Sequence, residues 1–167
     1  MSKTITAVFD TRTEAEFALA QLDQAGYTRA QVTMLITEES RGKHFGVDDK
    51  TKVAEGAATG ATIAGLSAGL FLALGSAGAL LVPGLNLIVS GALVGGLAGL
   101  GAGAVGGGLV GALVGLGVPE HEAKLYEDTI RKGAILIAVD ASDAAGAERV
   151  KSILKNTKAQ SITALAA

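Results

Sequence analysis

Residues 87–117 read LIVSGALVGGLAGLGAGAVGGGLVGALVGLG, with a glycine at every fourth position from Gly91 to Gly115. This run is the second half of a longer stretch, residues 56–119, that contains no Asp, Glu, Lys, Arg or His. A helix that crosses a bilayer needs about 20 apolar residues, so the stretch is long enough for two such helices. We therefore expect residues 55–118 to form a Gly/Ala-rich, transmembrane-type helical hairpin.

The hairpin is expected to turn at residues 82–86, because Pro83 and Gly84 suit the central positions of a type II turn. Small residues spaced four apart let helix backbones approach closely and pack, as in a glycine zipper. The expected helix-packing and oligomerisation positions are Gly65, Gly69, Gly91, Gly95, Gly99, Gly103, Gly107, Gly111 and Gly115. The alternative is a hairpin buried inside a soluble assembly, since core helices can also be apolar all round.

The N-terminal flank, residues 1–54, is expected to be a βαβ unit followed by a charged linker. Residues 4–9 are rich enough in β-branched and aromatic side chains for a strand. Thr11 begins a capping box for a helix that should end at Gly26. Alternating apolar residues then predict a second strand over residues 31–38.

The C-terminal flank, residues 134–167, repeats this order. Strands are expected over residues 134–139 and 160–165, around a helix capped by Ser142 or Asp143. Two βαβ units together make a four-stranded ferredoxin-like sheet. The predicted fold class is therefore α+β, a split ferredoxin-like domain (βαβ plus βαβ) with the helical hairpin inserted between its halves.

Residues 119–133 are expected to form an amphipathic juxtamembrane helix. Pro119 suits the first helical position, and Gly133 suits the position just after the last turn. The apolar contacts of this helix should be Leu125, Tyr126 and Ile130.

Basic residues stand on both sides of the uncharged stretch, whereas its expected turn carries none. The positive-inside rule then places both flanks, and both termini, in the cytoplasm. The expected location is the cytoplasmic (inner) membrane, with the lipid bilayer as a partner.

Composition argues against several classes of function. The net charge of −2 offers no basic surface for nucleic acid, and the absence of Cys removes thiol chemistry. Glu120, His121 and Glu122 are the one metal-like cluster, but adjacent helical residues point in different directions. We expect no catalytic, cofactor-binding or metal-binding residues and no enzymatic activity, and the sequence points to no known small-molecule substrate.

The chain resembles the bacterial heat-induced general stress protein family. The similarity is most specific from Gly117-Val118-Pro119-Glu120-His121-Glu122-Ala123, through Tyr126-Glu127, to Arg131-Lys132-Gly133-Ala134-Ile135-Leu136-Ile137-Ala138-Val139. The resemblance implies a stress-associated, membrane-linked protein with no established reaction, and it brings no catalytic residues.

The leading expectation is a non-enzymatic, self-associating, membrane-embedded stress-response or structural protein with a cytoplasmic ferredoxin-like head. It should form homo-oligomers, because the glycine spacing favours close helix packing. One alternative is a pore or permeability element formed by the glycine-zipper hairpins. Another is a soluble regulatory module whose hairpin is buried in a large homo-oligomeric assembly.

Overall fold

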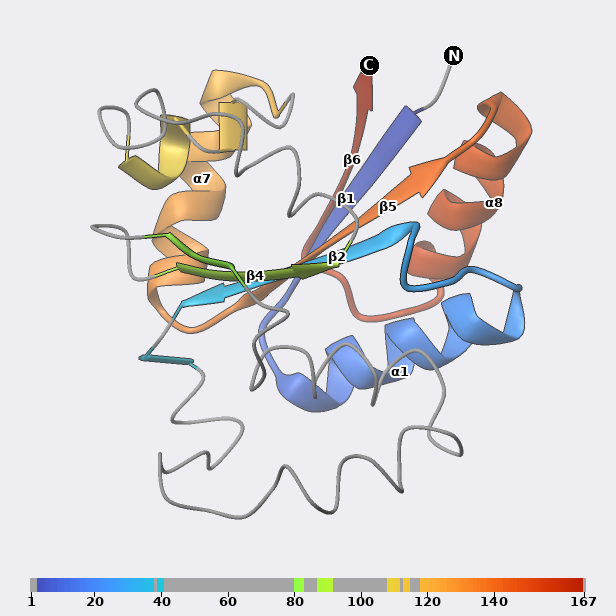
Figure 1. Cartoon of the computed structure of the whole chain (residues 1–167), viewed down its shortest axis with the longest axis horizontal. Coiled ribbons are helices and arrows are strands. Elements are labelled where there is room, and N and C mark those ends of the chain that lie inside the picture. The colour runs from blue at the N-terminus through green and yellow to red at the C-terminus, as the bar shows by residue number, and fades with distance from the viewer. Residues whose placement is uncertain are drawn as a thin grey trace.

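The structure is a computed structural model that describes residues 3–37, 39–40, 80–82, 87–91, 108–111, 113–114 and 118–166 (Figure 1). Residues 108–111 and 113–114 are helical. The main elements, in chain order, are β1 (Lys3–Phe9), α1 (Arg12–Gln24), β2 (Val32–Thr37), β3 (Leu80–Val82), β4 (Leu87–Gly91), α7 (Glu120–Arg131), β5 (Ile135–Ala141), α8 (Ala144–Lys155) and β6 (Ser161–Ala166).

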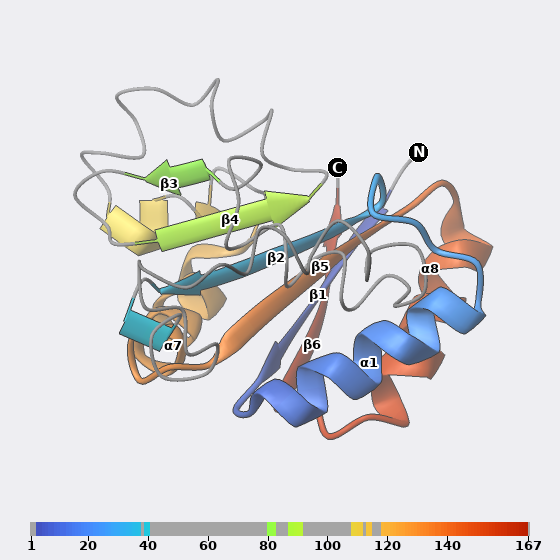
Figure 2. The same cartoon turned by 60° about the horizontal axis from the view of Figure 1, so that its bottom comes forward.

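The strands form one six-stranded sheet in the order β3-β4-β2-β5-β1-β6, and every neighbouring pair is antiparallel. Strand β5 lies between β1 and β2, and β1 lies between β5 and β6, so each flank forms a βαβ unit that is split by a strand of the other. The α+β class is therefore confirmed, and the order β2-β5-β1-β6 is compatible with the ferredoxin-like arrangement expected from the sequence. Strands β3 and β4 extend this sheet beyond β2 (Figure 2).

The helices of the two flanks begin where their capping residues predict. The Thr11 side chain accepts a hydrogen bond from the Glu14 backbone N–H at 3.3 Å, and Gly26 follows α1 with a φ of +88°. Asp143 caps α8 in the same way, since its Oδ1 accepts from the Gly146 N–H at 2.6 Å. These bonds satisfy backbone donors that a helix start leaves without an intrahelical partner.

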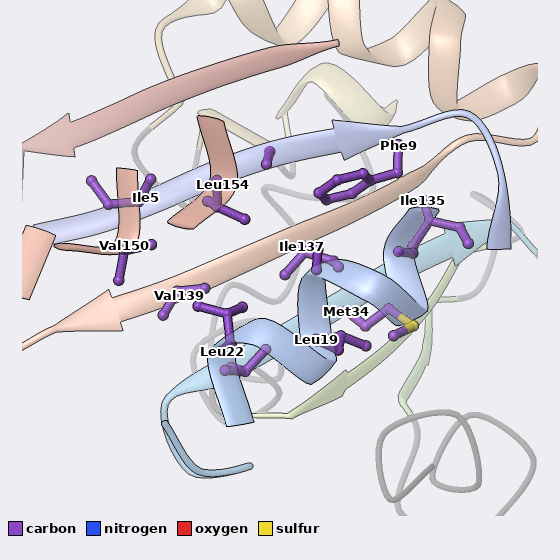
Figure 3. Packing of buried hydrophobic residues seen from close by; sticks show 14 of the residues in the cluster. Ile5, Phe9, Leu19, Leu22, Met34, Ile135, Ile137, Val139, Val150 and Leu154 are labelled. Atoms are coloured by element: carbon purple, nitrogen blue, oxygen red, sulfur yellow. The ribbon is translucent and has the colours of Figure 1, made fainter. Parts of the chain in front are cut away.

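One face of the sheet packs against α1 and α8 and forms the larger core (Figure 3). Every second residue of a strand points to the same face, so alternate positions of the central strands supply this core. Its large buried side chains include Ile5, Phe9, Leu19, Leu22, Met34, Ile135, Ile137, Val139, Val150 and Leu154.

The opposite face of the sheet is also covered, and Figure 1 shows α7 on the other side of the sheet from α1 and α8. The remaining alternate positions of the strands pack there with one face of α7 and with the helical residues near 110. This second core contains Val8, Leu35, Val89, Leu109, Leu113, Ala123, Tyr126, Ile130 and Leu136. Of the three apolar contacts expected for α7, Tyr126 and Ile130 are buried, whereas Leu125 is 67% exposed.

The expected transmembrane helical hairpin is wrong for the described part of residues 55–118. Two strands lie there, and β4 pairs with β2 from Thr37↔Leu87 to Thr33↔Gly91. In the ranges that the structure describes, no helix is both long enough and apolar enough to cross a bilayer. The physical reason is that Ile88 and Val89 each enter one of the two cores while the backbone of β4 completes the edge of β2.

Strand β3 pairs antiparallel with β4, and Val82 lies opposite Leu87, so the chain reverses direction between these two residues. This reversal joins two strands and not two helices. Pro83 and Gly84 themselves lie outside the described residues.

Candidate functional site

Of the nine glycines expected to pack helices, two lie in described segments. Gly91 is the last residue of β4, and Gly111 belongs to the helical segment 108–111. The remaining positions lie outside the described residues: Gly65, Gly69, Gly95, Gly99, Gly103, Gly107 and Gly115.

The candidate site in the structure is strand β6, which is the last strand of the sheet on one side. Its six residues pair with β1 from Lys3↔Ala166 to Val8↔Ser161. In the described ranges, no strand pairs with the outer side of β6. An open strand edge presents backbone N–H and C=O groups that another strand can bind.

The sequence of β6 does nothing to block such pairing. The strand reads SITALA, without a charged residue and without proline. Soluble proteins usually protect a sheet edge with lysine, proline, a bulge or a covering segment, because a flat uncharged edge invites pairing with another chain. We name the outer side of Ser161–Ala166 the β6 edge.

The strand is held in place on both of its faces. On one face, Ile162 packs against the larger core that α8 helps to form. On the other face, Ser161 and Thr163 meet two side chains of α7. Since β6 is also paired along β1, the β6 edge belongs to a strand whose position is set from three sides.

The meeting point of α7 and β6 is a group of polar side chains that we name the hydroxyl cluster: Glu122, Tyr126, Ser161 and Thr163. The Tyr126 hydroxyl lies 2.7 Å from Thr163 Oγ1, 3.2 Å from Ser161 Oγ and 3.5 Å from Glu122 Oε2. Thr163 Oγ1 also donates to Glu122 Oε2. Tyr126 is only 3% exposed and belongs to the second core, so the cluster joins that core to β6.

The metal-like trio of residues 120–122 is spread apart by the helix. Glu122 joins the hydroxyl cluster, whereas the His121 side chain is 78% exposed and its Nε2 lies 3.7 Å from Glu122 Oε1. Glu120 pairs with Lys124 at 2.7 Å between Oε1 and Nζ on the exposed surface of α7. No group of three or more potential ligands placed to hold a metal ion is found among the described residues.

The ion pair on α7 shifts the pKa values of both its members. The hydrogen bond from Lys124, and then its positive charge, lower the pKa of Glu120 below 4.5. The same hydrogen bond and the charge of Glu120 raise the pKa of Lys124 above 10.5. Both side chains are exposed, so solvent screening keeps this interaction weak.

Comparison of the chain with protein-family models, with curated proteins and with solved structures found no match. The relation to the general stress proteins therefore stays a prediction from the residues quoted above.

Sequence reasoning missed both the β6 edge and the hydroxyl cluster. Two signals were present: an uncharged strand over residues 160–165, and the i,i+4 and i,i+2 spacings of the pairs Glu122/Tyr126 and Ser161/Thr163. These spacings place each pair on one face of its element. They do not say that the two faces meet, because this depends on the order of strands in the sheet.

Proposed function

We propose that this chain is a non-enzymatic structural module that self-associates when two copies pair their β6 edges. The observation that supports this proposal is the β6 edge itself, a six-residue strand with no charge and no proline at the end of the sheet. The stress-related role that the resemblance implies would then be that of an assembling scaffold.

A second copy is the partner that fits this edge best. Two identical edges can pair antiparallel about a twofold axis, so that one contact satisfies both copies at once. Because the strand is uncharged, no like charges within it face each other across the axis. The pairing would join the two sheets into one continuous sheet.

The other end of the sheet favours an assembly that stops at two copies. That end is β3, which has three residues, against six in β6. A short edge offers few backbone hydrogen bonds to another chain. Once two β6 edges have paired, the edge that remains among the described strands of each copy is the shorter one, so we expect a closed dimer.

The test is the molar mass of the full chain in solution, measured by light scattering after size-exclusion chromatography, together with that of Ala164→Lys. Ala164 is exposed in β6, and a lysine there adds the charge with which proteins commonly protect an edge. We expect the unmodified chain to show twice the monomer mass and Ala164→Lys to show the monomer mass.

The matched control is Ser152→Lys, which adds the same charge at an exposed position of α8. This variant should keep the mass of the unmodified chain. A chain that stays monomeric at every concentration would contradict the proposal, and so would an Ala164→Lys variant that still dimerises.

A further inference from the structure

We infer that Tyr126 and Glu122 are positioning residues for the β6 edge: through the hydroxyl cluster they hold the strand in the shape that a second copy pairs with. This inference rests on the proposed self-association and adds residues outside the contact itself. Neither Tyr126 nor Glu122 belongs to β6, and both lie on α7.

The hydrogen bonds of the cluster meet at the Glu122 carboxyl group. The hydroxyls of Thr163 and Tyr126 both donate to Glu122 Oε2, Tyr126 at 3.5 Å. The Tyr126 hydroxyl also lies 2.7 Å from Thr163 Oγ1 and 3.2 Å from Ser161 Oγ. In each of these two contacts either hydroxyl can be the donor.

The result is a connected network of hydrogen bonds that joins Tyr126 and Glu122 of α7 to Ser161 and Thr163 of β6. Successive hydrogen bonds in such a network polarise each other. The Tyr126 hydroxyl is the middle link, because it bonds to two residues of β6 and to Glu122.

These hydrogen bonds fix β6 at two points on the same face of the strand. Ser161 and Thr163 are two residues apart, so their side chains leave β6 in the same direction. A third bond supports the second point, since the Thr6 hydroxyl of β1 donates to the Thr163 backbone oxygen at 3.5 Å. Because both side chains are hydrogen-bonded to α7, the backbone of β6 keeps its extended shape. The N–H and C=O groups of the β6 edge are therefore aligned before a second copy binds.

Preorganisation of this kind lowers the cost of binding, because the strand does not have to be ordered during association. Breaking the middle link should therefore weaken the dimer, although the Tyr126 side chain never touches the partner. A purely structural role would lower the stability of the monomer and leave the pairing of folded copies unchanged.

The experiment measures the dimer dissociation constant of the full chain by sedimentation equilibrium, with circular dichroism as the check of folding. Tyr126→Phe removes one hydroxyl and keeps the ring. We expect the dissociation constant to rise about tenfold, which corresponds to the loss of one to two hydrogen bonds.

The matched control is Tyr27→Phe. Tyr27 also uses its hydroxyl to join distant elements, because it donates to the Gly146 backbone oxygen at 3.2 Å on the α8 side of the molecule. Both variants lose one tyrosine hydroxyl, but the Tyr126 hydroxyl is bonded to β6 and the Tyr27 hydroxyl to α8, so Tyr27→Phe should leave the dissociation constant unchanged.

A second pair of variants asks whether the hydroxyl, and not the shape, matters at Thr163. Thr163→Val keeps the shape and loses the hydroxyl, whereas Thr163→Ser keeps the hydroxyl. We expect Thr163→Val to weaken the dimer as Tyr126→Phe does, and Thr163→Ser to restore pairing to near the unmodified value.

The outcomes separate the two proposals. If the unmodified chain does not dimerise, the proposed function fails. If it dimerises, and Tyr126→Phe leaves the dissociation constant unchanged or Tyr27→Phe raises it equally, the self-association stands and the positioning role is overturned. Equal loss in Thr163→Ser and Thr163→Val would also overturn the positioning role.

Discussion

Gly91 of β4 lies opposite Thr33 of β2, and its backbone there has a φ of +111°. A Cβ atom at Gly91 would stand 2.0 Å from the carbonyl oxygen of Val32. This glycine is therefore needed where two strands approach closely.

Replacing this glycine should detach or distort β4. In Gly91→Ala the new methyl group meets backbone atoms that cannot rotate away, and the positive φ adds strain. We expect a loss of about 2–4 kcal/mol in the free energy of unfolding, measured by denaturant titration.

Gly26→Ala is the control for the strain alone, because Gly26 has a φ of +88° with no atom within 4 Å of the added Cβ. It should cost only about 1–2 kcal/mol. Equal losses in the two variants would show that the close approach of β4 to β2 does not matter.

The second face of the sheet should behave as a true core. Leu136 is 1% exposed and packs in the cluster that α7 covers. Leu136→Ala should therefore lower the free energy of unfolding by about 2–5 kcal/mol, through lost burial and the cavity left behind.

Leu125→Ala on α7 removes the same side chain from a position that is 67% exposed. This control should change the free energy of unfolding by no more than about 0.5 kcal/mol. If Leu136→Ala cost as little, α7 would not cover a packed core.

The N-terminal cap of α8 can be tested by replacing the Asp143 side chain. Asp143→Ala removes the acceptor for the Gly146 N–H and should cost about 1 kcal/mol in thermal or denaturant unfolding. Asp143→Ser restores a side-chain oxygen at the same place and should recover most of the loss. A serine variant as unstable as the alanine variant would contradict the capping role.

The Glu120–Lys124 pair predicts a pH dependence that can be followed locally. The pKa of Glu120 is lowered from 4.5 by its partner, so its contribution is present above that value and is lost as the pH falls through the folded pKa. The pKa of Lys124 is raised from 10.5, so its contribution is present below that value and is lost as the pH rises through the folded pKa.

The measurement is the carbon-13 shift of the Glu120 carboxyl during a pH titration at low salt. We expect a midpoint below 4.5, which Lys124→Met should move back toward 4.5. High salt should have a similar, smaller effect, because exposed charges are screened. A midpoint that Lys124→Met leaves unchanged would show that the pair does not form in solution.

The elements of the two flanks could be predicted closely from local patterns. Strands expected over residues 4–9 and 31–38 lie at Lys3–Phe9 and Val32–Thr37, and the caps at Thr11 and Asp143 start their helices. Alternation of apolar residues and helix capping each involve residues only a few positions apart, so they can be recognised without knowledge of the fold.

The segment around β4 could not be predicted in this way. Leu87–Gly91 is an uncharged apolar run, and such a run fits a buried helix or a buried strand equally well. Its neighbours in the sequence favoured a helix because glycines recur every fourth residue. The strand forms because it pairs with the edge of β2, whose residues lie fifty or more positions away in the chain.

Helix α7 also combines features that local sequence predicts with features that it does not. Its bounds and two of its three expected apolar contacts, Tyr126 and Ile130, could be predicted from residues 119–133, but the surface that these side chains cover could not. An amphipathic helix can lie on a bilayer or on a sheet, since both offer an apolar surface. In the structure the face lies on β2, β5 and β1 through Leu35, Leu136 and Val8.

In the two flanks, local sequence thus decided which residues become strands and where helices begin and end, because these features depend on backbone preferences and on spacing within one turn or pleat. Tertiary structure alone decided which strands pair, which faces meet and which strand ends the sheet among the described residues. Those outcomes depend on contacts such as Ser161 with Tyr126 and Thr33 with Gly91, between residues far apart in the chain, where no local spacing records the partner.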